Sequence, residues 1–480
     1  MDTGRLVTEL REAVGPENVF AEPEELLTYE SDALSIYANL PLAVVLPGTT
    51  EEVQNTVRAA ARHNACIVPR GAGTGLSGGA LPHENGILIG FSRMNRILEV
   101  DLPNRRAVVQ PGVVNLHLSQ AVKGDGYYYA PDPSSQAACT IGGNAAENSG
   151  GPHCLKYGVT TNHIVGFEMV LPDGEVVELG GTVEDTPGLD LRGFGIGSEG
   201  MLGVITKITV RLLPLPEGVK TMIAVFNSME CACDAVSDII ADGLIPAALE
   251  MIDRQTIQLV EKTLRSGFPE SAAAVLLIEL DGPVAGMDEW VNTIEGHCRR
   301  NDSTEFRVAR SEEERARLWA GRKNAFGAFG QISPGFYCLD GTVPRSRIAE
   351  AVRRIEEVAR KYGISIANVF HAGDGNLHPL ILFDDRKPGE TDRVIQAGSE
   401  ILHACVELGG SLSGEHGIGI EKMMDIPAQF SEAALETMKR VKAVFDPDGR
   451  CNPAKVFPTP GRCGEVRAAA RRRLPAGVWI

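Results

Sequence analysis

Apolar and polar residues alternate between 42 and 69 in a pattern that predicts one βαβ unit. The apolar runs 42–47 and 65–69 are typical of strands, and between them apolar residues recur at helical spacing over 51–63. Thr50 precedes this stretch and belongs to the residue types that commonly cap a helix, so we expect the helix to begin behind it.

Short apolar runs continue up to the Pro-rich stretch LPLPEGV at 213–219, which we interpret as a domain boundary. Strands are predicted here at 86–91, 97–101, 106–112, 165–171, 175–179 and 204–213. Beyond the boundary, three apolar runs each precede a helical stretch, at 221–226, 247–252 and 273–280. This alternation predicts an open sheet with helices on one face, and the fold class is expected to be α+β.

The same pattern divides the chain into four parts. They are an N-terminal helical segment (1–38), a first domain (39–216), a second domain (217–458) and a tail (459–480). The tail carries the basic run Arg471–Arg473 before LPAGVWI, which we interpret as a disordered end.

Composition narrows the classes of partner. The 480 residues include 46 Lys and Arg against 63 Asp and Glu, a formal net charge of −17, which argues against nucleic acid as a partner. The start lacks the features of a secretion signal, and no apolar run reaches the ~20 residues of a transmembrane helix, so we expect a cytoplasmic protein. The ten cysteines include no C-x-x-C pair, so any iron–sulfur cluster would lie on another chain.

The stretch PRGAGTGLSGGA at 69–80 contains Gly73, Gly75 and Gly78 in the spacing G-x-G-x-x-G. A Rossmann turn needs a helix directly after the last glycine, whereas a second glycine and Leu81-Pro82 follow here. We therefore predict a loop whose backbone N–H groups surround a pyrophosphate without a helix. A flexible hairpin loop is the alternative.

Two more glycine-rich stretches follow, at 131–160 and 197–206. Their small residues would let the backbone approach a large planar ligand, and Asn144 and Asn148 could hydrogen-bond to it. Three such stretches in one domain predict a single extended ligand.

These stretches, in this order, resemble the FAD-binding domain of the vanillyl-alcohol oxidase/p-cresol methylhydroxylase superfamily. The similarity continues through LWAGRKNAF, ANVFHAGDGNLHPLI, GGSLSGEHGIG and FDPDGRCNPAK, which begin at 318, 367, 409 and 445. As a set they are similar to the FAD-linked oxidases that include the catalytic subunit of bacterial glycolate oxidase and the D-lactate and D-2-hydroxyglutarate dehydrogenases. The resemblance implies a two-subdomain, non-Rossmann FAD-binding domain, a cap domain for the substrate, and a C-terminal segment that returns to the flavin.

With FAD as the cofactor, the glycine-rich stretches and the returning segment supply the expected contacts. The positions predicted to bind FAD are Arg70, Gly71, Ala72, Gly73, Thr74, Gly75, Leu76, Ser77, Gly78, Pro131, Asp132, Ser135, Gly142, Gly143, Asn144, Asn148, Gly150, Gly151, Tyr157, Gly158, Glu199, Gly200, Gly203, Val204, Ile205 and Asn452.

The second half contains a candidate metal site. Asp374-Gly375 is typical of a two-residue hairpin turn, which would place His371 directly opposite His378 on one face. Two imidazoles side by side suit a divalent cation such as zinc, with Glu415 as a third candidate ligand. A structural role for each histidine is the alternative.

Two further residues are candidates for catalysis. His416 follows Glu415 on an extended segment, so its side chain should point the other way and serve as a general base. The resemblance implies that Arg322 binds the carboxylate of the substrate. Relatives that take larger substrates carry a polar residue near Phe326 and a lysine near Cys338, so a small 2-hydroxy acid is expected.

The resemblance implies oxidation of glycolate to glyoxylate, with D-lactate or another D-2-hydroxy acid as the alternative. Electrons would pass to FAD-binding and iron–sulfur partner subunits and the quinone pool, with peripheral attachment to the inner face of the plasma membrane through those partners. A non-catalytic FAD-binding electron-transfer subunit and a metal hydrolase using His371 and His378 are the other hypotheses. Retention of His416 and Arg322 argues against the former, and the glycine loops argue against the latter.

Overall fold

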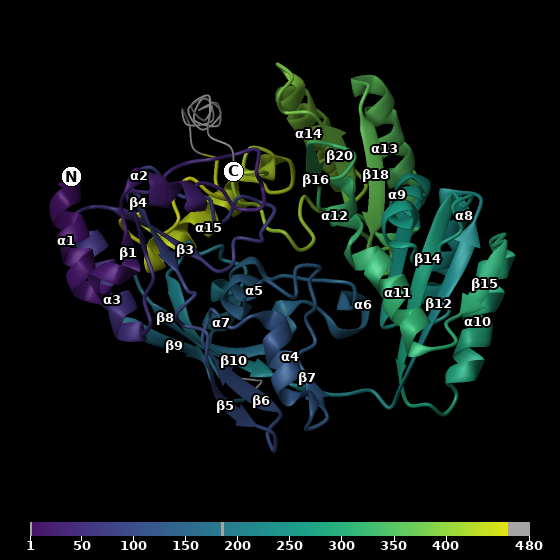
Figure 1. Ribbon diagram of the computed structural model, residues 1–480, viewed down its shortest axis with the longest axis horizontal. Helices are drawn as coiled ribbons and strands as arrows, with labels where there is room; N and C mark the ends of the chain where they lie inside the picture. Colours follow the sequence, from purple (N-terminus) through teal and green to yellow (C-terminus); the bar gives the residue numbers. More distant parts are fainter. Residues whose placement is uncertain (1, 184–186, 459–480) are drawn as a thin grey trace.

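The computed structural model describes residues 2–183 and 187–458, so the predicted tail lies outside the described residues. A purple-to-blue half and a teal-to-green half stand side by side, and the yellow C-terminal part lies over the first half (Figure 1). Within these residues, no helix is both long and apolar enough to cross a bilayer.

The first sheet has the order β1-β2-β4-β3 and confirms the predicted βαβ unit. Its strands are β1 (Val19–Phe20), β2 (Ala43–Val45), β3 (Cys66–Arg70) and β4 (Gly86–Gly90), and β2 and β3 both run parallel to β4. The crossover helix α3 (Thr50–Arg62) is capped by Thr49, whose hydroxyl accepts a hydrogen bond from the Glu52 amide. The expectation that Thr50 caps the helix is therefore wrong by one residue, because Thr50 already has helical geometry.

An antiparallel sheet of order β5-β6-β10-β8-β9 completes the first half. Its strands are β5 (Ile97–Asp101), β6 (Arg106–Val109), β8 (Ile164–Val170), β9 (Val176–Gly180) and β10 (Val204–Arg211). A small ribbon joins β7 (Tyr127–Tyr128) to β11 (Leu213–Pro214). The helices of this half are α1 (Thr3–Val14), α2 (Pro23–Leu26), α4 (Asn115–Lys123), α5 (Ile141–Glu147), α6 (Cys154–Tyr157) and α7 (Leu191–Gly195).

The second half is built on a seven-stranded antiparallel sheet of order β15-β12-β14-β13-β18-β20-β16. Its strands are β12 (Gly218–Phe226), β13 (Ala248–Asp253), β14 (Ala274–Gly282), β15 (Glu305–Val308), β16 (Gly335–Cys338), β18 (Ser365–Phe370) and β20 (Pro379–Phe383). The short strands β17 (Gly341–Thr342) and β19 (Asn376–Leu377) pair beside it.

Helices cover both faces of this sheet, so the prediction of helices on one face is wrong. One face packs on α8 (Met229–Ala241), α10 (Met287–Arg300), α13 (Ile348–Tyr362) and α14 (Glu390–Glu407). The other packs on α9 (Arg254–Leu264), α11 (Glu312–Lys323) and α12 (Ala325–Phe329). The reason lies in β12, where Met222 and Ala224 enter one core while Ile223 and Val225 enter the other. A strand that is apolar on both sides needs cover on both sides.

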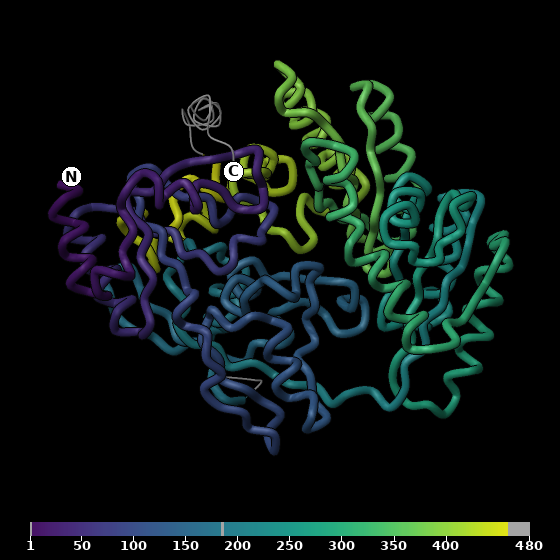
Figure 2. The backbone as a smooth tube through the Cα atoms, viewed as in Figure 1, coloured from purple at the N-terminus to yellow at the C-terminus, as the bar shows by residue number. Residues whose placement is uncertain are grey.

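The C-terminal segment returns to the first half. Helix α15 (Glu432–Phe445) lies among the N-terminal elements, as the yellow tube among purple segments shows (Figure 2). Cys451 then pairs in parallel with Ile67 of β3, and the Ile67 amide donates to the Arg450 carbonyl at 2.9 Å. The predicted return of the chain is thus a strand-like addition to the first sheet.

Buried charges join the two halves beside the sheets. His153, just before α6, pairs with Asp132 at 2.9 Å and with Glu279 of β14 at 3.3 Å. Burial opposes the charge on the ring, but these two carboxylates raise the pKa of His153 to about 10. The Tyr157 hydroxyl donates to Asp281 of the same strand at 2.6 Å. These contacts fix the orientation of the halves on either side of the cavity between them.

Candidate functional site

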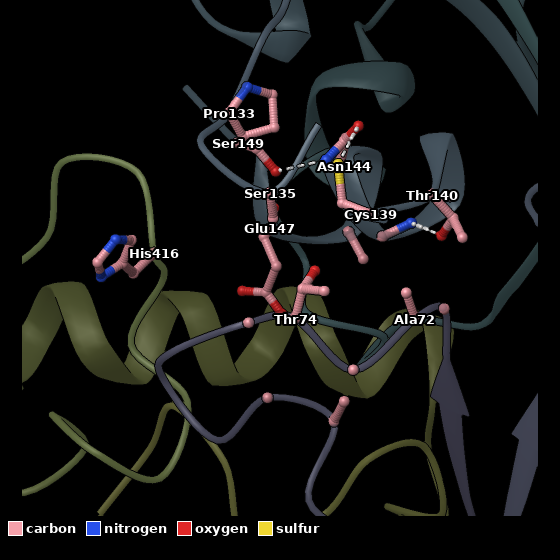
Figure 3. A pocket seen from close by; sticks show the side chains of 18 of the residues that line it. Ala72, Thr74, Pro133, Ser135, Cys139, Thr140, Asn144, Glu147, Ser149 and His416 are labelled. Carbon is pink, nitrogen blue, oxygen red and sulfur yellow. Dashed lines mark hydrogen bonds between the residues drawn. The ribbon is translucent and has the colours of Figure 1, made fainter. Parts of the chain in front are cut away.

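A cavity lies between the two halves, and its empty space, together with the open solvent at its mouth, is about 1710 Å³. Its wall is formed by the three glycine-rich stretches of the first half and by a small group of residues from the second. Figure 3 shows His416 on one side of this space, facing the loop that carries Ala72 and Thr74 and the segment that carries Ser135 and Thr140. One cavity therefore joins the predicted cofactor loops to the predicted catalytic residues.

The loop after β3 forms the floor of the cavity. Residues 71–85 are all described and contain no helix before β4, as expected for a non-Rossmann anion loop. The loop lies tightly against the start of α5: a Cβ on Gly71 would lie 2.3 Å from Thr140 Oγ1. Only glycine permits this approach, which brings two predicted cofactor stretches into one wall.

Fifteen of the predicted FAD positions line the cavity. They are Arg70, Gly71, Ala72, Gly73, Thr74, Gly75, Leu76, Ser135, Gly142, Gly143, Asn144, Glu199, Gly200, Gly203 and Ile205. Other wall residues were not predicted, including Gly79, Pro111, Thr140, Glu147, Ser149, Lys323 and Phe336. Most of them lie in or beside the predicted motifs, so their position in a motif was the only sequence feature that could have indicated that they line the cavity.

The structure places the remaining predicted FAD positions off the cavity wall. They are Ser77, Gly78, Pro131, Asp132, Asn148, Gly150, Gly151, Tyr157, Gly158, Val204 and Asn452. Several have structural partners instead: Asn148 accepts from the Thr161 amide, and the Tyr157 hydroxyl donates to Asp281. Asn452 donates to the carbonyls of Gly79 and Glu199 at 2.8 and 2.6 Å, so it holds two wall segments together from behind.

The predicted metal ligands converge on one point. Glu415 Oε1 lies 3.1 Å from His371 Nε2 and 3.0 Å from His378 Nε2. All three side chains could offer one ligand atom to a common ion. His378 and Glu415 lie on the cavity wall, and His371 lies behind them.

The hairpin that carries the two histidines differs in register from the prediction. His371 pairs with Asn376, and β18 and β20 continue this register, so the loop has four residues rather than two. Because the shift is by two residues, His378 stays on the same face as His371, and their ring centroids are 5.0 Å apart. The expected direct pairing is wrong, yet the shared face is retained.

In both histidines the inner ring nitrogen, Nε2, faces Glu415, and the outer one, Nδ1, contacts other groups. His371 Nδ1 lies 2.9 Å from both carboxylate oxygens of Glu250, and His378 Nδ1 donates to the Leu339 carbonyl at 3.0 Å. Burial would lower the pKa of His371, but Glu250 and Glu415 raise it well above its usual value. A cation is therefore favoured at the inner nitrogens, either protons on the rings or a metal ion between them.

Asp340 fixes the loop that presents Glu415 and His416. Its carboxylate is fully buried and accepts hydrogen bonds from the amides of Gly414, Glu415 and His416 at 2.8–3.2 Å. It also accepts from the Ser413 hydroxyl at 2.6 Å. This wrapped loop is not extended, so Glu415 and His416 both reach the cavity wall, contrary to the expectation that they point in opposite directions.

His416 lies flat against His378. Their rings are stacked with centroids 4.9 Å apart and an interplanar angle of 9°. Burial lowers the pKa of His416 to about 4, and its Nδ1 has no hydrogen-bond partner among the described residues. His416 is therefore a neutral imidazole on the cavity wall whose buried Nδ1 is left without a partner by the described residues, and a neutral imidazole is able to accept a proton.

Arg322 is fully buried behind the wall. Its Nη2 pairs with Glu250 at 2.6 Å and lies 3.3 Å from His371 Nδ1. Burial opposes ionisation of Glu250, but Arg322 and His371 hold its pKa below the usual value. Arg322 Nε and Nη1 are buried without a hydrogen-bond partner in the described chain. Unpartnered buried donors are unusual and favour an anionic ligand nearby.

The space beside Gly75 allows a test of whether FAD occupies the cavity. A Cβ on Gly75 would meet no described heavy atom within 4 Å, although Gly75 lies on the wall. We expect Gly75→Leu to leave the thermal stability of the apoprotein unchanged and to weaken FAD binding by about tenfold or more, because the side chain occupies cofactor space. Gly124→Leu, equally open but after α4, is the matched control. Equal FAD affinities of both variants and the unmodified protein would contradict this assignment.

Comparisons with known proteins agree with this architecture. Residues 41–180 match the FAD binding domain family, and residues 215–456 match the C-terminal domain of FAD linked oxidases. Among solved structures, p-cresol methylhydroxylase has the same fold, with a TM-score of 0.80 over 94% of this chain and 96% of that one at 19% identity.

Curated relatives match over nearly the whole chain. Glycolate oxidase subunit GlcD of Escherichia coli K12 is 49% identical over 98% of this chain and 94% of its own length. The subunit of the same name from Bacillus subtilis is 42% identical over 95% and 97%. D-lactate dehydrogenase of Anaerostipes hadrus is 31% identical over 95% and 97%. The chain therefore belongs to the FAD-linked oxidases.

Proposed function

We propose that this FAD-linked oxidase converts a small 2-hydroxy acid to the 2-oxo acid, with glycolate to glyoxylate as its preferred reaction. The observation that carries the proposal is the single cavity shared by the glycine loops and by His378, Glu415 and His416. The GlcD relatives, at 49% and 42% identity, favour glycolate over D-lactate.

The chain's own residues have distinct roles in this reaction. His416 accepts the proton of the substrate hydroxyl on its imidazole, which burial keeps neutral. Arg322 is the candidate for the substrate carboxylate through its unpartnered Nε and Nη1, and because it is fully buried off the cavity wall this contact requires the wall residues in front of it to move. Bound FAD would supply the two-electron acceptor that the oxidation of the substrate carbon requires. Phe326 and Phe336 present apolar side chains on the wall, which favours a short acid.

A divalent cation at His371, His378 and Glu415 is part of the proposal. Two imidazole nitrogens and a carboxylate oxygen within contact of one another fit such an ion, and Glu250 and the Leu339 carbonyl orient the rings from outside. These three residues would hold the ion beside the substrate hydroxyl and favour its ionised form.

Electrons then leave the reduced protein through a partner. The relatives' name, a subunit of glycolate oxidase, supports an assembly with further subunits. We propose that those partners bind FAD and an iron–sulfur cluster and hold the chain at the inner face of the plasma membrane.

Flavin bleaching under anaerobic conditions tests the function. We expect glycolate to bleach the FAD absorbance of the loaded protein faster than D-lactate, and L-lactate and malate to be slow. Bleaching by D-lactate alone would favour the dehydrogenase activity, and no bleaching by any 2-hydroxy acid would favour a non-catalytic electron-transfer subunit.

Removal of the metal gives a separate prediction. Dialysis against a chelator should lower the bleaching rate by about 10–100-fold and leave FAD bound, and Zn²⁺ or Mn²⁺ should restore the rate. An unchanged rate in protein shown by elemental analysis to be metal-free would contradict the metal assignment.

A further inference from the structure

The last residue of α5, Glu147, lies on the cavity wall and has no role in the reaction described above. Its side chain extends toward the loop that carries Thr74 (Figure 3). Its Oε2 atom is buried without a hydrogen-bond partner among the residues that the structure describes. A carboxyl group so placed needs either a proton or a partner outside the chain.

Two glycines leave just enough room for this carboxyl group. A Cβ on Gly79 would lie 2.5 Å from Glu147 Oε1, and a Cβ on Gly417 would lie 2.4 Å from Oε2. Gly79 belongs to the anion loop, and Gly417 follows the proposed base His416. The Glu147 carboxyl group is therefore wedged between the cofactor loop and the catalytic loop.

A second carboxylate, Glu199, lies against the first. The same Cβ position on Gly417 would be 2.9 Å from Glu199 Oε1. Burial raises the pKa of Glu199 as well, but its two oxygens accept hydrogen bonds from the Ile418 and Gly419 amides at 2.7 Å each, and these bonds favour its ionised form. Glu147 receives no such bond. Two adjacent buried carboxyl groups cannot both ionise easily, so the proton belongs to Glu147.

The other charged groups around Glu147 do not move the proton from Glu147 to Glu199. Burial and the neighbouring Glu199 raise the pKa of Glu147 well above its usual value, and Asp32 adds to the effect. Lys422 and Lys455 oppose it, but Lys422 already pairs with Asp340 and the Gly417 carbonyl, and Lys455 donates to the Leu81 carbonyl.

We propose that Glu147 stays protonated in the FAD-loaded protein and donates its hydrogen bond to an acceptor atom of FAD. The pyrophosphate oxygens and the ring carbonyl oxygens of FAD only accept hydrogen bonds, and an ionised carboxylate against them would be repelled. This inference rests on FAD binding by the family and is independent of which 2-hydroxy acid is oxidised.

FAD affinity without substrate tests the inference, and it does so separately from the proposed reaction. Apoprotein is titrated with FAD and flavin fluorescence is followed for the unmodified protein, Glu147→Gln and Glu147→Leu. At pH 6.5 we expect Glu147→Gln, which keeps a neutral donor, to bind within about threefold of the unmodified protein, and Glu147→Leu to bind about tenfold more weakly. A tenfold change in Glu147→Gln, or no change in Glu147→Leu, would overturn the proposal.

The pH dependence of FAD affinity tests whether protonated Glu147 favours FAD binding. The raised pKa means that Glu147 ionises only at high pH, so FAD affinity of the unmodified protein should fall above that pKa by up to about tenfold per pH unit. Glu147→Gln should lack this component of the decline. Parallel pH profiles in the two proteins would overturn the proposal.

Infrared spectroscopy detects the proton directly. The FAD-loaded protein should show the C=O stretch of a protonated carboxyl group that Glu147→Gln lacks. Glu168→Gln is the matched control. Glu168 does not line the cavity and pairs with Lys207 at 2.7 Å. Burial opposes its ionisation, yet its pKa lies below the usual value. The control should keep the band and the FAD affinity. Absence of a Glu147-dependent band would show an ionised carboxylate and overturn the proposal.

Discussion

Replacing His416 by glutamine is expected to slow flavin reduction by glycolate by about 10²–10⁴-fold, the usual contribution of a general base. Glutamine keeps the approximate volume of the ring and the loop held by Asp340, but it cannot accept the hydroxyl proton. The stacking against His378 is also lost. Stopped-flow absorbance of the anaerobic, FAD-loaded variant measures the effect.

The control for this variant is His403→Gln. His403 pairs with Asp425 at 3.0 Å and its side chain is 45% exposed, so its replacement should leave the rate unchanged. FAD affinity should be similar in both variants. If His416→Gln reduced its flavin as fast as the control, His416 would not be the base and the proposed mechanism would be wrong.

Asp340→Asn is expected to lower kcat/KM by about 10–100-fold, although Asp340 does not itself line the cavity. Three consecutive amides and a hydroxyl donate to its carboxylate, and asparagine offers one acceptor oxygen in place of two. Glu415 and His416 would then be held less tightly, and the buried Lys422 would lose an ionic partner at 3.4 Å.

Metal content and flavin reduction of Asp340→Asn should fall together, while FAD stays bound. The exposed pair of Asp384 with Arg386 provides a matched control, and Asp384→Asn should behave like the unmodified protein. A fully active Asp340→Asn variant with its normal metal content would show that the loop is held without this carboxylate.

Local patterns predicted much of the fold because the strands and helices have clear periodicity. The βαβ unit of β2, α3 and β3 is an example. The cover on both faces of the seven-stranded sheet was not predicted, although β12 and β14 are apolar at successive positions, because a continuous apolar run also fits a strand in a one-sided layer.

Contacts between distant segments could not be predicted from one sequence. The hairpin register was misjudged because Asp374-Gly375 was given a two-residue turn, whereas Val343 packs against Gly375 and the loop has four residues. The pairing of Arg322 with Glu250, 72 positions apart (322 − 250), has no local signal. Glu147 lies inside a predicted cofactor motif, but nothing in the motif indicates that it reaches the cavity wall beside Glu199, which comes from another stretch.

The crystal structure of the FAD-loaded protein tests the central claim most directly, namely that the two halves form one site. The account predicts the pyrophosphate against the backbone of Arg70–Gly75 and the flavin ring within contact of His378 and His416. A flavin ring bound on the first half and out of contact with both histidines would contradict it.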